Sequence, residues 1–471
     1  MTPPDAALLD SRWPFSITQT VALFGVLGAL EVWAAVVGAR DPVRFAAVAF
    51  FALACAVSFR YTLAGLSLLI LFQLRVLQGT AEISAEEVAY AALFFVTVLG
   101  WFVRESRTDI GRRALRSPLG RSLGLFLGLC AASLVVTVAM EGSPLWWFRD
   151  LVRFSYFLLF FPIATTLRSR RDVAVVGACL LAVVLFQGLS TVYFYGKAVA
   201  ATQALWQLRY QRVALHEVFA MAALVGAFAL FLRTRSRAIA AFGVALGIIC
   251  IVSLAASLTR GYWVAAALAA ALAYFIARGR PSRAAAFTAI VVAAIGIVAV
   301  GLFSSKVIGV VSSLLDRVST FTAPLRVLSM RERFAETRAL LEGIRRSPIV
   351  GHGLGATVSY MSPLRGHVMT RTYAHNAYLF IWFKLGIVGL ATFLVFYVRG
   401  IRTTLAAIRT VRSRDAKALL AAGAALLLAF VPLSFTSPQY YGKSSALVIV
   451  LILGFAQAIL LRRHVADGEG G

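Results

Sequence analysis

The sequence predicts an all-α integral membrane protein, a bundle of about 12–14 transmembrane helices with one large extracytoplasmic loop. Hydrophobic residues make up 60% of the chain and charged residues 14%, against about 25% charged residues in an ordinary globular domain. Apolar stretches of about 17–22 residues recur from end to end, each long enough to cross a hydrocarbon core as a helix. Because nothing between them could form a separate soluble core, residues 1–471 are predicted to be a single membrane domain.

The apolar stretches give the expected positions of the helices. The stretches near 43–59 and 61–78 are short and separated by a tight turn at Arg60, which is why the count stays a range. The expected helices lie near 16–38, 43–59, 61–78, 87–103, 122–140, 149–167, 173–194, 214–232, 238–258, 262–277, 284–304, 376–398, 418–436 and 445–461.

The distribution of basic residues predicts the orientation in the membrane. Arg104–Arg121 contains six arginines and Arg399–Lys417 six basic residues, and three arginines lie in each of Arg168–Arg171, Arg233–Arg237 and Arg278–Arg283. These segments are alternate loops, and loops rich in Lys and Arg stay in the cytoplasm. Both termini are therefore predicted to be cytoplasmic, and the net charge of +26 reflects loop anchoring rather than nucleic-acid binding.

The loop at 305–375 departs from this pattern. Ser305–Ala374 carries ten basic residues against four acidic ones, although it is predicted to lie on the outer side. Loops longer than about 60 residues escape the orientation rule, so the excess needs another explanation. An anionic ligand at the outer face is one candidate, and anchoring on anionic lipid headgroups is the alternative.

Three local patterns organise this loop. Ser329 and Glu332 have the spacing of a capping box, which predicts an amphipathic helix as far as Arg346. Its apolar side is expected to contain Phe334, Leu340, Leu341 and Ile344. The run Gly351-His352-Gly353-Leu354-Gly355 predicts a sharp, close-packed turn, because no strand precedes it as a dinucleotide site requires.

The loop ends at His375-Asn376. Asn376 is a candidate N-cap for the helix that follows. His375 would then lie beside the positive end of a helix dipole, which favours the neutral imidazole that a general base needs. A purely structural or solvated histidine is the alternative.

His375-Asn376 is followed by nine residues, Gly386, two residues and Gly389. This HN-x9-G-x2-G spacing resembles the signature of the O-antigen ligases, within the wider O-antigen ligase and polymerase superfamily. Thr259-Arg260-Gly261 is similar to the family's Ser/Thr-Arg-Gly element. Arg333, fifteen residues before Pro348 and the Gly351-His352-Gly353 run, is similar to its arginine helix followed by Pro-x-x-Gly-x-Gly. The resemblance covers Leu254–Leu390.

The resemblance implies a glycosyltransferase in the bacterial inner membrane, with part of its active site in a large helical periplasmic loop. It is expected to need no metal ion or cofactor, because the four acidic residues of the loop form no ligand-like cluster. It would move a glycan from undecaprenyl diphosphate to an acceptor hydroxyl, with lipid A-core oligosaccharide as the expected acceptor. His375 would be the general base, and Arg260 and Arg333 would bind the diphosphate, as guanidinium groups pair well with phosphate. Further substrate contacts are expected from Arg212, Asn376, Arg338 and Lys384.

Other functions remain open from the sequence. An O-antigen polymerase would use a second lipid-linked repeat unit as acceptor, and a protein O-glycosylating relative would use a protein. A flippase or transporter of lipid-linked oligosaccharides would also have many helices and buried charges. Transporters usually place their site at the midplane between repeated halves, whereas this sequence shows no internal repeat and its candidate polar residues gather at the outer face.

Overall fold

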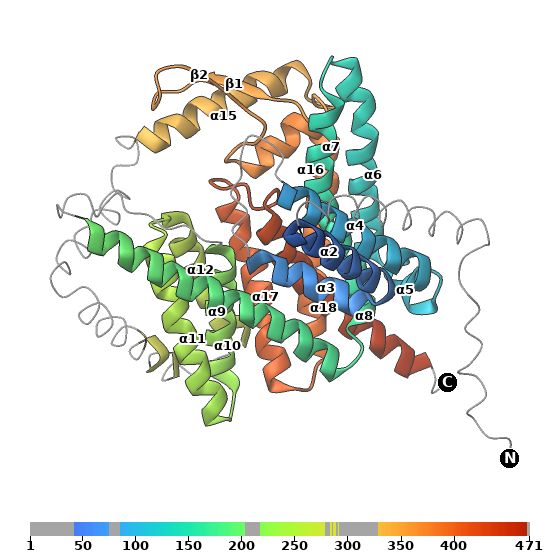
Figure 1. The fold of residues 1–471 in the computed structure, drawn as a ribbon, viewed down its shortest axis with the longest axis vertical. Helices are drawn as coiled ribbons and strands as arrows, with labels where there is room; N and C mark the ends of the chain where they lie inside the picture. The colour runs from blue at the N-terminus through green and yellow to red at the C-terminus, as the bar shows by residue number, and fades with distance from the viewer. Residues whose placement is uncertain are drawn as a thin grey trace.

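The computed structural model describes residues 42–74, 85–202, 217–277, 283–284, 286–288, 291 and 328–468. These residues are almost entirely helical, which confirms the predicted fold class (Figure 1). The helices are α2 (Pro42–Arg60), α3 (Thr62–Leu71), η2 (Phe72–Leu74), α4 (Ala85–Glu105), α5 (Asp109–Arg116), α6 (Pro118–Ala139), α7 (Pro144–Ser155), η3 (Tyr156–Leu159), α8 (Phe160–Thr166), α9 (Arg170–Ala201), α10 (Glu217–Arg233), α11 (Arg237–Ala256), α12 (Arg260–Ala277), α15 (Leu328–Arg346), α16 (Ala377–Thr410), α17 (Arg414–Leu433) and α18 (Lys443–Gly468). The strands are β1 (Val358–Met361) and β2 (Val368–Arg371).

Within the described residues, 8 helices are long and apolar enough to cross a membrane, namely α4, α6, α9, α11, α12, α16, α17 and α18. The chain is thus a multi-pass membrane protein. The predicted spans at 16–38 and 284–304 lie outside the described residues, apart from a few positions near 284–291.

Two predicted spans differ from the helices observed. The helix expected at 376–398 continues as α16 to Thr410, and Arg399, which we placed in a loop, donates from Nη1 to the carbonyl of Pro118 at 2.9 Å. The span expected at 149–167 is divided into α7, the 3-10 turn η3 and α8. Pro162 contributes to this division, because its nitrogen cannot bond the carbonyl four residues earlier.

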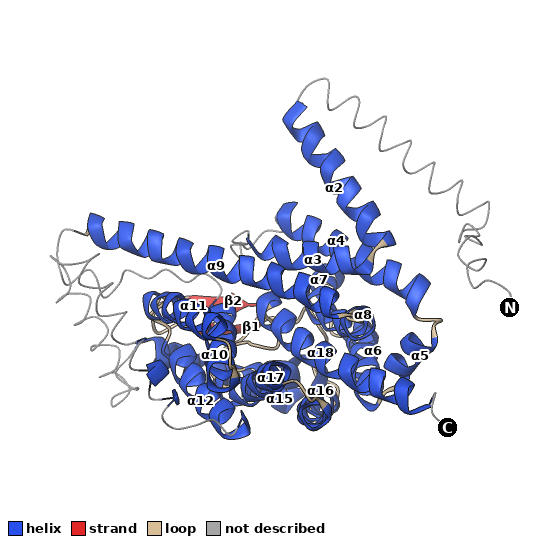
Figure 2. Cartoon of the chain, turned by 90° about the horizontal axis from the view of Figure 1, so that it is seen from below, coloured by secondary structure: helices blue, strands red, loops and turns tan. Residues whose placement is uncertain are grey.

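The helices surround a central pair, α17 and α18. α12 and α10 pack on α17, while α8 and α16 pack on α18. Seen at right angles to the first view, α9 crosses beside α11 and α3, with which it is in contact (Figure 2). α15 and the β1–β2 hairpin lie together at one end of the molecule, which we call the α15 end (Figure 1).

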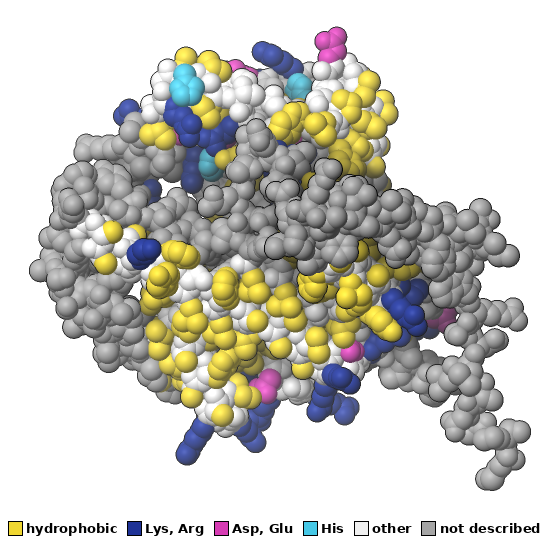
Figure 3. All heavy atoms as spheres, viewed as in Figure 1, with side chains coloured by type: hydrophobic (Ala, Val, Ile, Leu, Met, Phe, Trp, Pro, Cys, Tyr) yellow, Lys and Arg dark blue, Asp and Glu magenta, His cyan; other side chains and the backbone are white. Residues whose placement is uncertain are grey.

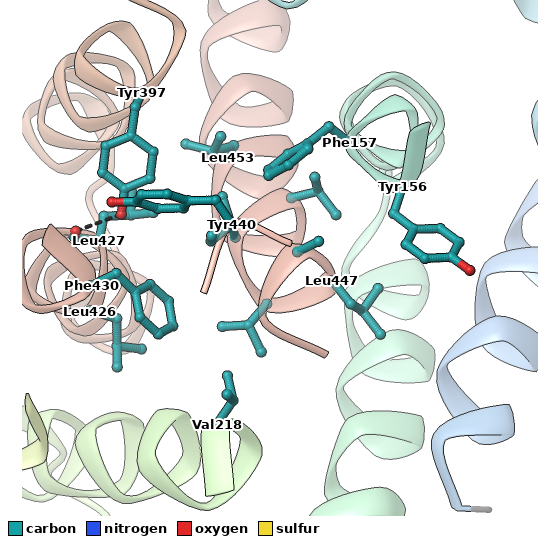
Figure 4. Close-up of a cluster of buried hydrophobic side chains, with 14 of the residues drawn as sticks. Tyr156, Phe157, Val218, Tyr397, Leu426, Leu427, Phe430, Tyr440, Leu447 and Leu453 are labelled. Atoms are coloured by element: carbon teal, nitrogen blue, oxygen red, sulfur yellow. Dashed lines mark hydrogen bonds between the residues drawn. The ribbon is translucent and has the colours of Figure 1, made fainter. Parts of the chain in front are cut away.

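Aromatic side chains fill the centre of the bundle. Tyr440 lies against Phe393 and Tyr397, with ring centroids 4.7 and 5.0 Å away. The Tyr397 hydroxyl donates to the carbonyl of Leu427 at 2.7 Å (Figure 4). Outside this core, apolar side chains cover the lower helices, basic side chains gather along the lower edge, and histidines lie with Lys and Arg at the α15 end (Figure 3). The bundle is thus apolar both inside and along its sides.

The buried face of α15 differs in part from the one predicted. The helix is described from Leu328 and reaches Arg346 as expected. Phe334 and Leu341 are 53% and 40% exposed, and the buried side contains Glu332, Glu336, Leu340 and Ile344. These four residues follow one another at intervals of four, which places them on one face of a helix. The expected apolar side is thus confirmed for Leu340 and Ile344 and wrong for Phe334 and Leu341.

The β1–β2 hairpin was not predicted. Its strands are antiparallel, with Val358 opposite Arg371 and Met361 opposite Val368. Its polar inner groups bond to α15: the Tyr360 hydroxyl and the Ser362 hydroxyl donate to the two carboxylate oxygens of Glu332, at 2.9 and 2.6 Å. The hairpin therefore holds the first turns of α15 in place.

Candidate functional site

A break in α16 binds the glycine turn at the α15 end of the molecule. Gly386 has φ 68° and ψ −178° inside the helix, a combination that is almost confined to glycine. The break frees backbone groups: the carbonyls of Phe383 and Lys384 accept from the N–H groups of His352 and Gly353, at 3.0 and 2.8 Å. In a membrane-spanning helix such groups must find partners within the protein. The glycine turn provides them.

The predicted turn at Gly351–Gly355 is confirmed. Gly351, Gly353 and Gly355 have φ values of 72°, 82° and 84°, in the region that favours glycine. A Cβ on Gly353 would lie 2.2 Å from Thr137 Oγ1, and one on Gly355 would lie 2.4 Å from the backbone nitrogen of Trp147. The turn is thus a close-packed wedge between α6, α7 and α16.

The predicted N-cap is also confirmed. Oδ1 of Asn376 accepts from the N–H groups of Tyr378 and Leu379, both at 3.1 Å. The N–H of Ala377, the residue directly after Asn376, donates to the carbonyl of Ser434 at 2.8 Å. The start of α16 is therefore tied both to its own cap and to the end of α17.

His375 meets a carboxylate that the sequence analysis did not select. Its ring Nδ1 lies 3.0 Å from Oε2 of Glu336, and its backbone N–H donates to the same oxygen at 2.9 Å. The Glu336 side chain is 1% exposed and that of His375 is 26% exposed. Among the described residues, no hydrogen-bond partner is found for His375 Nε2. The histidine thus presents one edge of its ring to a buried carboxylate and leaves the other edge available.

Arg333 lies close to this pair through the helix it shares with Glu336. Residues three apart on a helix are surface neighbours, about 5–6 Å apart at Cβ. Arg333 is half-buried. Arg333 is therefore a neighbour of Glu336 on the surface of α15.

The turn that carries Arg260 packs against the end of α17. Arg260 is the first residue of α12, and a Cβ on its neighbour Gly261 would lie 3.1 Å from Leu433 Cδ1. Since Ala377 bonds to Ser434, the segment that follows Leu433 separates the Arg260 turn from the His375 turn. Thr259 Oγ1 donates to Glu217 Oε1 at 3.2 Å, which fixes the Arg260 turn to the start of α10.

Arg371 and Tyr373 line the approach to His375. Arg371 Nη1 donates to the Tyr373 hydroxyl at 2.8 Å, and the ring of Tyr373 lies 6.1 Å from that of His375. Burial alone would lower the pKa of Arg371, but its net pKa is raised by Tyr373, Tyr360, Glu336 and Glu332. This guanidinium therefore stays charged beside the histidine.

Lys384 does not lie at this site. Its side chain is 1% exposed and its ammonium contacts Oδ2 of Asp150 on α7. Asp150 Oδ2 also accepts from the Gly355 N–H at 2.8 Å, and the Tyr441 hydroxyl donates to its Oδ1. Lys384 thus belongs to a buried ion pair that joins the glycine turn to the bundle, and its expected contact with substrate stays a prediction. The ion pair itself was not predicted, because the partner is 234 positions away.

The remaining predicted contacts are of two kinds. Arg338 has an 85% exposed side chain and forms an ion pair with Glu342 at 3.4 Å, one turn further along α15. Its role in substrate binding stays a prediction. Arg212 lies outside the described residues.

Within the described part of the chain, no group of three or more His, Cys, Asp or Glu side chains is arranged to hold a metal ion. The carboxylates of the α15 end are instead engaged by hydroxyl groups, backbone N–H groups and His375.

Comparison with known families bears on this end of the molecule. Residues 245–394 match the family model described as O-antigen ligase. The match covers about a third of the chain, and this segment is thus similar to O-antigen ligases. The matched segment runs from α11 through α12 and α15 to the broken part of α16, so it includes Arg260, Arg333, Glu336 and His375. No curated protein matches the chain.

Two acidic residues were not singled out from the sequence, Glu336 inside the matched segment and Asp150 outside it, although each had a signal. Glu336 is spaced at four from Glu332 and Leu340, so an acidic residue recurred on the buried face of an amphipathic helix. Asp150 lies inside an apolar stretch, where ionisable residues are costly and usually paired. Both signals point to a partner without identifying it.

Proposed function

We propose that this protein is a glycosyltransferase of the O-antigen ligase type. It moves a glycan from undecaprenyl diphosphate to a hydroxyl of lipid A-core oligosaccharide, on the periplasmic side of the bacterial inner membrane. The observation that carries the proposal is the His375–Glu336 contact beside Arg333, within the segment that matches the family. The basic loops described above support cytoplasmic termini and a periplasmic α15 end.

In the proposed reaction the acceptor hydroxyl attacks the anomeric carbon of the donor glycan. A new C–O bond forms, the bond between that carbon and the diphosphate oxygen breaks, and the diphosphate leaves with the electron pair. Nε2 of His375 takes the hydroxyl proton, which is general-base catalysis and is worth about 10²–10⁴-fold in rate.

Arg333 and Arg260 hold the leaving diphosphate in this proposal. A guanidinium stays charged and can donate two parallel hydrogen bonds to phosphate. Charge that develops on the leaving oxygens is then stabilised without a metal ion. The apolar sides of the bundle offer a surface for the lipid tail of the donor.

The decisive experiment measures glycan transfer by purified protein with lipid-linked donor and lipid A-core acceptor. His375→Ala is expected to lower turnover by about 10²–10⁴-fold, while the matched control His367→Ala, an exposed histidine of the hairpin turn, keeps it. Full turnover by His375→Ala would refute the proposed base. Loss of activity in EDTA that a divalent ion restores would refute metal independence.

The same variant separates the alternatives in cells. A ligase that has lost His375 leaves lipid-linked polymer and uncapped lipopolysaccharide core. A polymerase leaves single repeat units on the core, and a flippase leaves lipid-linked units on the cytoplasmic side.

The arginines are tested by conservative replacement. Arg333→Lys and Arg260→Lys keep the charge but lose the planar fork. Each is expected to lower kcat/KM for the donor by at least about tenfold, whereas Arg346→Lys, on the exposed side of α15, is the control that keeps it.

A further inference from the structure

Glu336 contacts His375 twice through one oxygen. Oε2 accepts from the backbone N–H of His375 at 2.9 Å and lies 3.0 Å from ring Nδ1. Two contacts with one residue fix both the backbone position and the rotation of the ring. A merely incidental ion pair would need only the ring.

The contact also determines where the ring carries its proton. When Glu336 is ionised its oxygens can only accept hydrogen bonds, and Nδ1 is then the donor. In the neutral ring Nε2 then has the free lone pair, and it is the nitrogen for which no partner is found among the described residues. The tautomer that Glu336 selects is therefore the one that a base needs at Nε2.

Glu336 is buried and, among the described residues, has one unpaired oxygen, which bears on how it affects the charge of His375. Its side chain is 1% exposed, and its second oxygen, Oε1, is buried without a hydrogen-bond partner in the described part of the chain. A buried carboxylate with one oxygen unpaired is costly to the fold. A proton gained by the His375 ring would lie beside this carboxylate, whose charge favours the imidazolium.

A neighbouring carboxylate explains how Glu336 keeps its place. Glu332, one turn earlier on α15, is bonded to the hairpin through Tyr360 and Ser362 and lies 3.8 Å from Arg371. Glu332 thus anchors the helix, and Glu336 needs no other support from its own side chain.

We propose that Glu336 is a positioning residue for His375, which fixes its tautomer and compensates its charge as the acceptor proton arrives. This inference rests on the proposed function, since it assumes that His375 is the base. Glu336 acts only through the histidine, with no contact to the sugars.

The test compares Glu336→Gln, Glu336→Asp and the control Glu342→Gln, an exposed residue of the same helix. Gln keeps the size and an acceptor oxygen but lacks the charge. It is expected to lower kcat by about 100-fold and to change the donor KM by less than about threefold. Asp keeps the charge one methylene further away and is expected to recover part of the loss. Glu342→Gln is expected to behave as the parent protein.

A double variant separates positioning from general destabilisation. In the His375→Ala background, Glu336→Gln is expected to cost less than about twofold, because residues that act as a unit are not additive. A further loss comparable to that in the parent would overturn the inference. So would a rise in KM with kcat unchanged.

The outcomes distinguish the two proposals. If His375→Ala is inactive and both Glu336 variants are fully active, the positioning role is wrong and the proposed function stands. If His375→Ala is active, the proposed function itself fails. If Glu336→Gln does not fold, the kcat and KM of Glu336→Asp decide: unchanged values would also overturn the inference.

Discussion

Asp150 and Glu336 are both buried carboxylates with a basic partner, Lys384 and His375 respectively, but they differ in how fully their oxygens are occupied. Asp150 is closed: Lys384, Tyr441 and the Gly355 N–H occupy both of its oxygens, and the two charged side chains are each 1% exposed. Glu336 is open: one oxygen holds His375, the other has no hydrogen-bond partner among the described residues, and the histidine is 26% exposed.

The difference shows that a buried carboxylate with a basic partner can serve either stability or reactivity. A saturated buried network has one arrangement and therefore fixes the geometry of the segments it joins. A partly satisfied one is poorer for stability, but it leaves a group able to change its protonation state. We therefore expect substitutions in the Asp150 cluster to change stability first, and substitutions around Glu336 to change turnover first.

The largest stability effect is expected for Lys384→Met. It leaves Asp150 charged and buried without its cation, which costs about 3–5 kcal/mol in the free energy of unfolding. The measurement is thermal unfolding of the detergent-solubilised protein. Adding Asp150→Asn should recover much of the loss, because it removes the orphaned charge while keeping an acceptor oxygen for Gly355 or Tyr441. Unchanged stability of Lys384→Met would remove the distinction between the two carboxylates.

Gly386→Ala should have the next largest effect. Alanine does not tolerate φ 68° with ψ −178°, and its Cβ would lie 1.8 Å from the carbonyl oxygen of Ile349. Strain and displacement of the glycine turn are expected to cost about 3 kcal/mol. Gly366→Ala is the matched control, since Gly366 has φ 72° but nothing within 4 Å of the added Cβ; about 1 kcal/mol is expected there. Equal losses in both variants would show that the close packing of the turn contributes nothing.

The sequence predicts some features of the fold and misses others. The described transmembrane helices, the glycine turn and the Asn376 cap follow from hydropathy, glycine spacing and capping chemistry, all of which are local. The Gly386 break was not predicted, because its freed carbonyls bond to a loop more than thirty positions earlier, at His352 and Gly353.

The candidate site divides in the same way. His375, Arg260 and Arg333 come from short patterns along the chain, whereas Glu336 and Asp150 gain their meaning from partners 39 and 234 positions away. A single sequence indicates that such acidic residues are buried. Only the packing shows which cation or histidine each one meets.

A smaller effect, and one that depends on pH, is expected for Glu332. Burial raises its pKa, but hydrogen bonds from Ser362, Tyr360 and Leu364 and the charge of Arg371 lower it further, so the net pKa is below its usual value. The ionised form therefore stabilises the fold above the unfolded pKa of about 4.3, and this contribution is lost as the pH falls through the lower folded pKa.

Glu332→Gln should remove that dependence. The variant is expected to lose about 1–2 kcal/mol at neutral pH, where charge-assisted hydrogen bonds are replaced by neutral ones. The two proteins should converge as the pH falls below the lowered folded pKa of Glu332. Unfolding curves from pH 7 down to pH 3 test this, and parallel curves at all pH values would contradict it.

The smallest effect is expected for Arg338→Ala, at an exposed residue of the helix that carries Glu336. Its ion pair with Glu342 is solvated and should contribute no more than about 0.5 kcal/mol to stability. If Arg338 assists the anionic donor as the sequence predicts, the donor KM of the variant should exceed that of the parent about twofold to threefold at low ionic strength. In high salt this difference should disappear, because exposed charges are screened. Arg346→Ala is the control. A salt-independent fall in kcat would instead place Arg338 at the reacting centre, and an unchanged KM would exclude it from the donor site.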